Sequence, residues 1–120
     1  MTILNDIKEP HYWLFGEIYS VLSAFAEDPN NVILRIGGGR INVAEDQAHH
    51  LHETLRTIAA HYADAADLEV MKVTQKIDKI LEQRSADGEL FDPTFWKNSG
   101  FMRHPDWADI RDIARAFLIR

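Results

Sequence analysis

Apolar residues recur every three or four positions in four separate stretches of this chain. Such spacing places them on one face of an α-helix, and a helix with an apolar face is stabilised by burying it. The stretches run from about Pro10 to Ala26, from Val43 to about Tyr62, from Leu68 to Gln83 and from Pro105 towards the C-terminus. We therefore predict four main helices that pack around one core, with residues 1–120 forming a single compact domain.

The first of these helices is apolar over more than half of its circumference. It carries one stripe of Leu14, Ile18, Val21, Leu22 and Phe25 and, beside it, a second stripe of Tyr12, Phe15 and Tyr19. A helix of this kind lies at the centre of a core or is shared with another subunit. We expect the central position, and the second arrangement leaves a homodimer open.

A short β-branched run, Val32–Ile36, lies between the first two helices and is followed by Gly37–Gly39 and by a second short apolar run, from Arg40 to Val43. This pattern predicts a β-hairpin whose turn glycines adopt positive φ. Asn42 and Glu45 have the spacing of a capping box at the start of the next helix. The expected fold class is therefore α+β and mostly helical, with four main helices plus a short hairpin between the first and the second.

Two segments leave the secondary structure less determined. Leu68–Thr74 fits a helix better but also has the composition of a strand, which would extend the hairpin to a three-stranded sheet. The segment from Ser85 to Pro105 is irregular but rich in aromatic residues, so we expect it to fold back onto the helices rather than to form a solvated linker. Asp92-Pro93 predicts a single helical turn there, which Gly100 ends.

Composition limits the classes of function. The net charge of −6 opposes general attraction to nucleic-acid phosphates, and the absence of cysteine excludes disulfides, thiolate zinc sites and a cysteine nucleophile. No secretion signal and no apolar stretch long enough to cross a bilayer is visible in the sequence. We expect a cytoplasmic protein with no cofactor, no direct binding of nucleic acid and no membrane association.

A cluster of polar residues on the second predicted helix suggests a metal site. The candidate ligands are His49, His50, His52 and Glu53. Residues three or four positions apart share a helix face and are able to bind one ion. However, the buried stripe of this helix directs the three histidines in different directions, so a solvated face is the more strongly predicted alternative.

Arg56 and His61 are separated by four residues, a spacing that fits an Arg-x4-6-His motif. In this motif the chain resembles the HEPN ribonucleases, helical proteins that use such a pair from each of two subunits. The resemblance implies a dimeric ribonuclease in which Arg56 and His61 are the catalytic residues.

The last predicted helix carries Arg111 and Arg115 as neighbours. Two guanidinium groups at this spacing suit an anionic partner or a carboxylate ligand, whereas pairing with the protein's own acidic residues is the simpler expectation. The aromatic segment from Phe91 to Phe101 has a similar pair of interpretations, as a groove or interface and as additional core.

The leading functional hypothesis is a small acidic interaction protein of the adaptor, inhibitor or immunity type, which binds a larger protein with a basic surface. The ribonuclease and a metal-binding or small-ligand-binding helical domain are the alternatives. The residues expected to contact a partner are Tyr12, Phe15, Tyr19, Phe95, Trp96, Phe101, Arg111 and Arg115.

Overall fold

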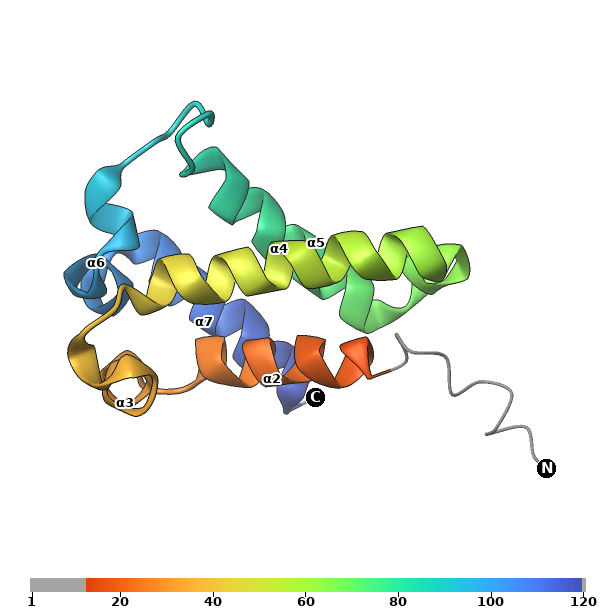
Figure 1. The fold of residues 1–120 in the computed structure, drawn as a ribbon, viewed down its shortest axis with the longest axis horizontal. Helices are drawn as coiled ribbons and strands as arrows, with labels where there is room; N and C mark the ends of the chain where they lie inside the picture. Colours follow the sequence, from red (N-terminus) through yellow and green to blue (C-terminus); the bar gives the residue numbers. More distant parts are fainter. Residues whose placement is uncertain (1–12, 120) are drawn as a thin grey trace.

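A computed structural model of the protein describes residues 13–119, and all the regular secondary structure in this part of the chain is helical (Figure 1). The α-helices are α2 (Leu14–Ala26), α3 (Pro29–Arg35), α4 (Val43–His61), α5 (Glu69–Gln83), α6 (Asn98–Arg103) and α7 (Pro105–Leu118). Three short 3-10 helices connect them: η1 (Gly37–Gly39), η2 (Ala63–Asp67) and η3 (Pro93–Trp96). No β-strand is present among the described residues, so the predicted α+β class is wrong and the fold is all-α.

The four long helices pack around one core. α7 packs against α2 and α5, and α4 packs against the same two helices from another side. In Figure 1, α4 runs along the length of the molecule with α2 beside it, while α5 diverges from α4 towards its own C-terminus. None of the helices within residues 13–119 is long and apolar enough to cross a membrane.

The predicted hairpin is replaced by a short helix. Val32 and Ile33 are buried on one face of α3, and Asp28 accepts a hydrogen bond from the backbone N–H of Asn30 at 2.9 Å. The Asp-Pro pair that ends α2 therefore also starts α3, because an acidic N-cap followed by proline is a helix start. A short apolar run is compatible with a strand or a buried helix, and here the packing of its two buried residues selects the helix.

The glycines after α3 make the turn that positive φ permits. Gly37, Gly38 and Gly39 have φ of 82°, 58° and 83°. A Cβ on Gly37 would also collide with the side chain of Ile41. Positive φ is thus present as expected, but it reverses the chain between two helices rather than between two strands.

The predicted inward faces of the first, second and last helices are confirmed except at Tyr62 and Ile113, which are only half-buried. The buried residues are Leu14, Ile18, Val21, Leu22 and Phe25 of α2, Ala44, Ala48, Leu51, Leu55 and Ile58 of α4, and Trp107, Ile110, Ala114 and Phe117 of α7. The predicted start of the first helix near Pro10 lies outside the described residues. The start of the second at Val43 is correct, although its cap differs from the prediction.

The capping box at the start of α4 is absent. Asn42 makes no side-chain cap, and the backbone N–H of Val43 instead donates to Oδ1 of Asn98 at 3.1 Å. The amide of Asn98 in turn donates to the carbonyl oxygen of Ile41 at 2.9 Å. One side chain from α6 therefore holds the start of α4, which leaves Glu45 free of a capping role.

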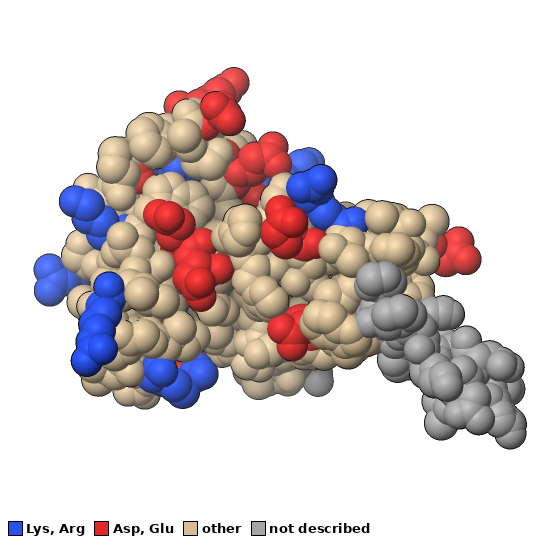
Figure 2. Space-filling view, in the orientation of Figure 1, with Lys and Arg blue, Asp and Glu red and all other residues tan. Residues whose placement is uncertain are grey.

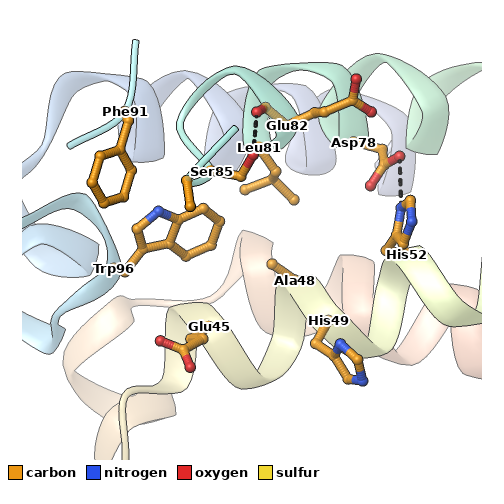
Figure 3. Close-up of a pocket in the computed structure, with 11 residues that line it drawn as sticks. Glu45, Ala48, His49, His52, Asp78, Leu81, Glu82, Ser85, Phe91 and Trp96 are labelled. Carbon is orange, nitrogen blue, oxygen red and sulfur yellow. Dashed lines mark hydrogen bonds and ion pairs between the residues drawn. The ribbon is translucent and has the colours of Figure 1, made fainter. Parts of the chain in front are cut away.

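The open choice at Leu68–Thr74 is decided in favour of a helix, since α5 begins at Glu69. The buried face of α5 contains Val70, Met71, Thr74, Ile77 and Leu81, whereas Val73 and Ile80, which the periodicity also placed inward, are only half-buried. The stripe is thus rotated slightly from the expected one. This rotation brings Asp78 and Glu82 to the side of α5 that faces α4 (Figure 3).

The aromatic segment after α5 folds back onto the helices as expected. Asp92 starts η3 by accepting the N–H of Thr94 at 3.0 Å. Gly100 does not end this turn, as predicted, but lies inside α6, where a Cβ would overlap the carbonyl oxygen of Thr94. The close approach of α6 to η3 therefore depends on glycine at this position.

Candidate functional site

A groove of about 450 Å³ lies between α4 and α5, at the end where the two helices diverge (Figure 3). From α4 it is lined by Glu45, Ala48, His49 and His52, and from α5 by Asp78, Leu81 and Glu82. The chain that follows α5 closes the groove with Ser85, Ala86, Phe91 and Trp96. We call this set the α4–α5 groove.

Helical spacing explains why these side chains share the groove. The four α4 residues stand at positions i, i+3, i+4 and i+7, and Asp78, Leu81, Glu82 and Ser85 repeat that spacing. Each set therefore lies along one face of its helix. Since the two faces are opposite one another, acidic groups from α4 and α5 approach the groove from two sides.

Two aromatic residues form the end wall of the groove. Nε1 of Trp96 donates a hydrogen bond to the carbonyl oxygen of Arg84 at 2.8 Å, and the indole packs edge-on against Phe95 with ring centroids 4.8 Å apart. Because its polar atom is already bonded, the indole presents only its apolar ring surface to the groove. Phe91 stands beside it and is 49% exposed.

The charge of the groove is entirely negative at neutral pH if histidine is taken as neutral. Glu45, Asp78 and Glu82 line it, and no Lys or Arg is among the lining residues that the structure describes. Figure 2 shows acidic side chains spread over the face formed by α4 and α5, while Lys and Arg gather mainly at the end where α3 and α6 lie. The groove thus lies on the acidic part of the visible face.

The ionisation of Asp78 is perturbed by its position in the groove wall. Burial in the groove wall raises the pKa of Asp78 above its ordinary value of 3.8. A hydrogen bond from Nδ1 of His52 at 3.4 Å and the charge of that ring lower the pKa, and the charge of Glu82 raises it again. The net shift is upward because desolvation is the largest effect.

The candidate metal ligands are not brought together. His50 bonds to Glu17 of α2 at 2.9 Å, His52 to Asp78 of α5 at 3.4 Å, and Glu53 to Arg56 at 3.4 Å. Across residues 13–119, no three His, Cys, Asp or Glu side chains are grouped closely enough to hold a metal ion. His49 lines the α4–α5 groove together with His52, so of the three histidines only His50 is directed elsewhere, towards α2, and the predicted divergence is only partly confirmed.

Arg56 and His61 do not share a helix face. Five positions along α4 separate them, which places them about 140° apart around the helix axis. Arg56 is exposed beside Glu53, whereas His61, at the end of α4, lines a second hollow together with Phe15 and Tyr62. A shared site for these two residues is therefore not formed within one copy of the chain.

The aromatic residues predicted to bind a partner divide into three groups. Phe95 and Phe101 are fully buried, and both pack against Trp107. Phe15 is half-buried, while Tyr19 is 42% exposed beside Phe117. Trp96 lines the α4–α5 groove, and Tyr12 lies outside the described residues. Of the aromatic candidates that the structure describes, only Trp96 therefore contributes to this groove.

The two arginines of α7 bond to backbone carbonyls. Nε of Arg115 donates to Ala26 at 2.6 Å, and a terminal nitrogen of Arg111 donates to Phe101 at 3.3 Å. Burial lowers the pKa of Arg111, and the charge of Arg115 lowers it further. These bonds satisfy carbonyls at or near the ends of α2 and α6, so both arginines act as structural links between helices.

Three acidic residues of the groove have no predicted site role in the sequence: Glu45, Asp78 and Glu82. The repeated i, i+4, i+7 spacing of polar residues on the two helices is a signal that each set shares a face. That the two faces meet depends on how α4 and α5 pack, which periodicity does not specify.

The fold and this groove define an all-α domain with an acidic, aromatic-walled groove. No protein-family model matches the sequence, and no curated protein and no solved structure is significantly similar to it. The function is therefore argued from the chemistry of the groove.

Proposed function

We propose that this chain is a non-enzymatic protein-binding module of the cytoplasm, which acts by covering a basic surface on a larger protein. The observation that carries the proposal is the α4–α5 groove, which combines carboxylates from two helices with an aromatic wall and has no cationic lining residue among those described.

The composition of the groove favours a protein partner. Protein interfaces typically combine a few buried aromatic anchors with a polar rim, and complementary charge accelerates encounter and selects the partner. Phe91 and Trp96 supply the anchors, and Glu45 and Glu82 supply the negative rim. The net charge of −6 adds long-range attraction towards a basic surface.

The test is affinity purification of the tagged full chain from its native host, with three baits compared side by side. The baits are the natural chain, Glu45→Lys/Glu82→Lys, and the control Asp67→Lys/Asp109→Lys. The control changes net charge by the same amount at two exposed positions outside the groove. We expect one stoichiometric partner to be retained by the natural chain and the control, and lost from the groove variant.

Salt and sizing complete the test. Because complementary charges are screened by ions, the partner should dissociate as salt is raised from about 0.1 M to about 0.5 M, as light scattering on the purified complex would show. A partner that the groove variant and the control retain equally would contradict the proposal. So would a chain that purifies only as a homo-oligomer, with no second protein.

A further inference from the structure

We infer that the α4–α5 groove binds an arginine side chain of the partner, with its guanidinium group against the ring of Trp96 and bonded to the carboxylates of Glu45 and Glu82. This inference rests on the proposed function and names the chemical group that the groove recognises.

The first step is the fixed position of Trp96. Its indole nitrogen is bonded to the carbonyl oxygen of Arg84, and Phe95 packs edge-on against the ring. The ring is therefore oriented before any ligand arrives, and it offers a π surface on which a cation is stabilised. A planar guanidinium stacks on such a surface and is more weakly hydrated than an ammonium group, which favours arginine over lysine.

The second step is the supply of free carboxylates. Glu45 and Glu82 are exposed, and neither side chain makes a hydrogen bond or ion pair with any residue of the described chain. In Figure 3 Glu45 lies on the α4 side of the groove and Glu82 on the α5 side, with the carboxylate of Glu82 extending along α5 away from Trp96. A guanidinium has five N–H donors in a fixed fork, and exposed glutamate side chains change rotamer readily, so both carboxylates are able to turn towards a guanidinium whose plane lies on Trp96.

The third step is that no neighbouring cation fills the groove. Arg84 is the arginine next to the groove in the chain, but its Nε bonds to Asp106 of α7 at 2.7 Å and one terminal nitrogen bonds to the carbonyl oxygen of Leu90 at 3.1 Å. The carboxyl group of the nearby Asp78 is already hydrogen-bonded to the ring of His52. The two free glutamates are therefore left for a cation from outside the chain.

The experiment is an NMR titration of the full chain, observing the indole N–H signal of Trp96 and the backbone signals of α4 and α5. The probes are capped tripeptides, Gly-X-Gly, in which X is arginine, lysine or citrulline, together with free spermidine. Citrulline has nearly the shape of arginine but no charge. The arginine peptide should give saturable shifts, citrulline none, and lysine a clearly weaker affinity.

Variants locate the site. In Glu45→Gln/Glu82→Gln the affinity for the arginine peptide should fall about tenfold or more, because two charge-assisted hydrogen bonds are lost. The matched control Asp67→Asn/Asp109→Asn changes net charge equally and should bind as the natural chain does. Phe91→Leu, at an exposed position, tests the aromatic wall without disturbing the bond between Trp96 and Arg84.

Each other outcome overturns the inference. Equal binding of citrulline, equal loss in the control variant, or equal affinity for lysine would exclude a guanidinium site built on these residues. Tighter binding of spermidine than of the arginine peptide would make the ligand a free polyamine rather than a protein side chain.

The two experiments together distinguish a failure of this inference from a failure of the proposed function. If the arginine peptide does not bind but Glu45→Lys/Glu82→Lys still loses the purified partner, the groove is a protein interface that does not recognise arginine. If the partner is retained by that variant, the proposed function itself is wrong.

Discussion

Trp107 of α7 is joined to Phe95 of η3 through both its ring and its nitrogen. The two rings are stacked, with centroids 4.8 Å apart and planes 15° from parallel, and Nε1 of Trp107 donates to the carbonyl oxygen of Phe95 at 2.9 Å. Since Trp96 is the next residue in the chain, this contact also positions the aromatic wall of the α4–α5 groove.

The Trp107 contact predicts a large effect of a small change. Trp107→Phe keeps an aromatic ring in the core but leaves the carbonyl oxygen of Phe95 without its donor and opens a small cavity. We expect the free energy of unfolding to fall by about 2–3 kcal/mol, measured by urea denaturation. The control Trp13→Phe, at a residue 59% exposed, should change it by less than about 0.5 kcal/mol. Equal effects of the two substitutions would contradict the role of the Trp107–Phe95 contact.

Two helical glycines should respond to alanine in opposite directions. In Gly100→Ala the new Cβ meets the backbone of Thr94 and Phe95, so we expect a loss of about 1–3 kcal/mol in the free energy of unfolding. Gly16 lies in α2, and no atom outside its own helical turn lies within 4 Å of the place that a Cβ would take, so Gly16→Ala should gain about 0.5–1 kcal/mol from helix propensity. Thermal unfolding of both variants measures this, and a stable Gly100→Ala variant would contradict the packing of α6 on η3.

The raised pKa of Asp78 predicts how stability depends on pH. A folded-state pKa above 3.8 means that folding favours the protonated carboxyl, so the contribution of Asp78 to the free energy of unfolding falls as pH rises through the folded pKa. Asp78→Asn removes this penalty, and its pair with His52 contributes little because that pair is partly exposed. The variant should therefore gain stability relative to the natural chain as pH rises from about 3 to about 7.

A direct NMR titration of the Asp78 carboxyl carbon checks the same effect. In the natural chain the charge of His52 lowers the pKa of Asp78. His52→Gln removes this charge and weakens the bond between the two residues. The pKa of Asp78 should therefore lie higher in this variant than in the natural chain. A pKa at or below 3.8 in the natural chain would show that burial does not dominate at this position.

Arg115 should contribute to stability through its bond to the end of α2. Arg115→Ala removes the donor to the carbonyl oxygen of Ala26, and we expect a loss of about 1 kcal/mol, at the low end for a charged donor because the side chain is exposed. Arg103→Ala is the control, since Arg103 is exposed and bonds to no described residue through its side chain. Chemical denaturation measures the difference, provided that the free energy of unfolding falls with denaturant at the same slope in both variants. Equal losses in Arg115→Ala and Arg103→Ala would exclude this role for Arg115.

The periodicity of apolar residues is a sufficient guide to the long helices. Ile18, Leu51 and Ile110 are buried where the spacing predicts, because a helix with an apolar stripe has one low-energy way to meet a core. The same reasoning separates His50 from His49 and His52, since helix geometry alone sets their directions. Both results follow from residues close together in the chain.

The segment Val32–Ile36 shows where local pattern is insufficient. Its β-branched residues favour a strand, but a strand needs a partner, and the described chain supplies none. Because Val32 and Ile33 are buried against the other helices, the segment forms the helix α3 and not a strand. Likewise, Trp96 on the groove and Phe95 in the core are adjacent in the chain, and only their contacts with Arg84 and Trp107 separate their roles.

Short-range spacing in the sequence therefore specifies which side of each long helix is apolar, because that property depends on neighbours one or two turns away. The tertiary structure is needed to identify the α4–α5 groove, since Glu45 and Glu82 line the same groove only when α4 and α5 pack and diverge, with Trp96 closing the end. Contacts between residues distant in the chain carry no periodic signal, and it is those contacts that create the site.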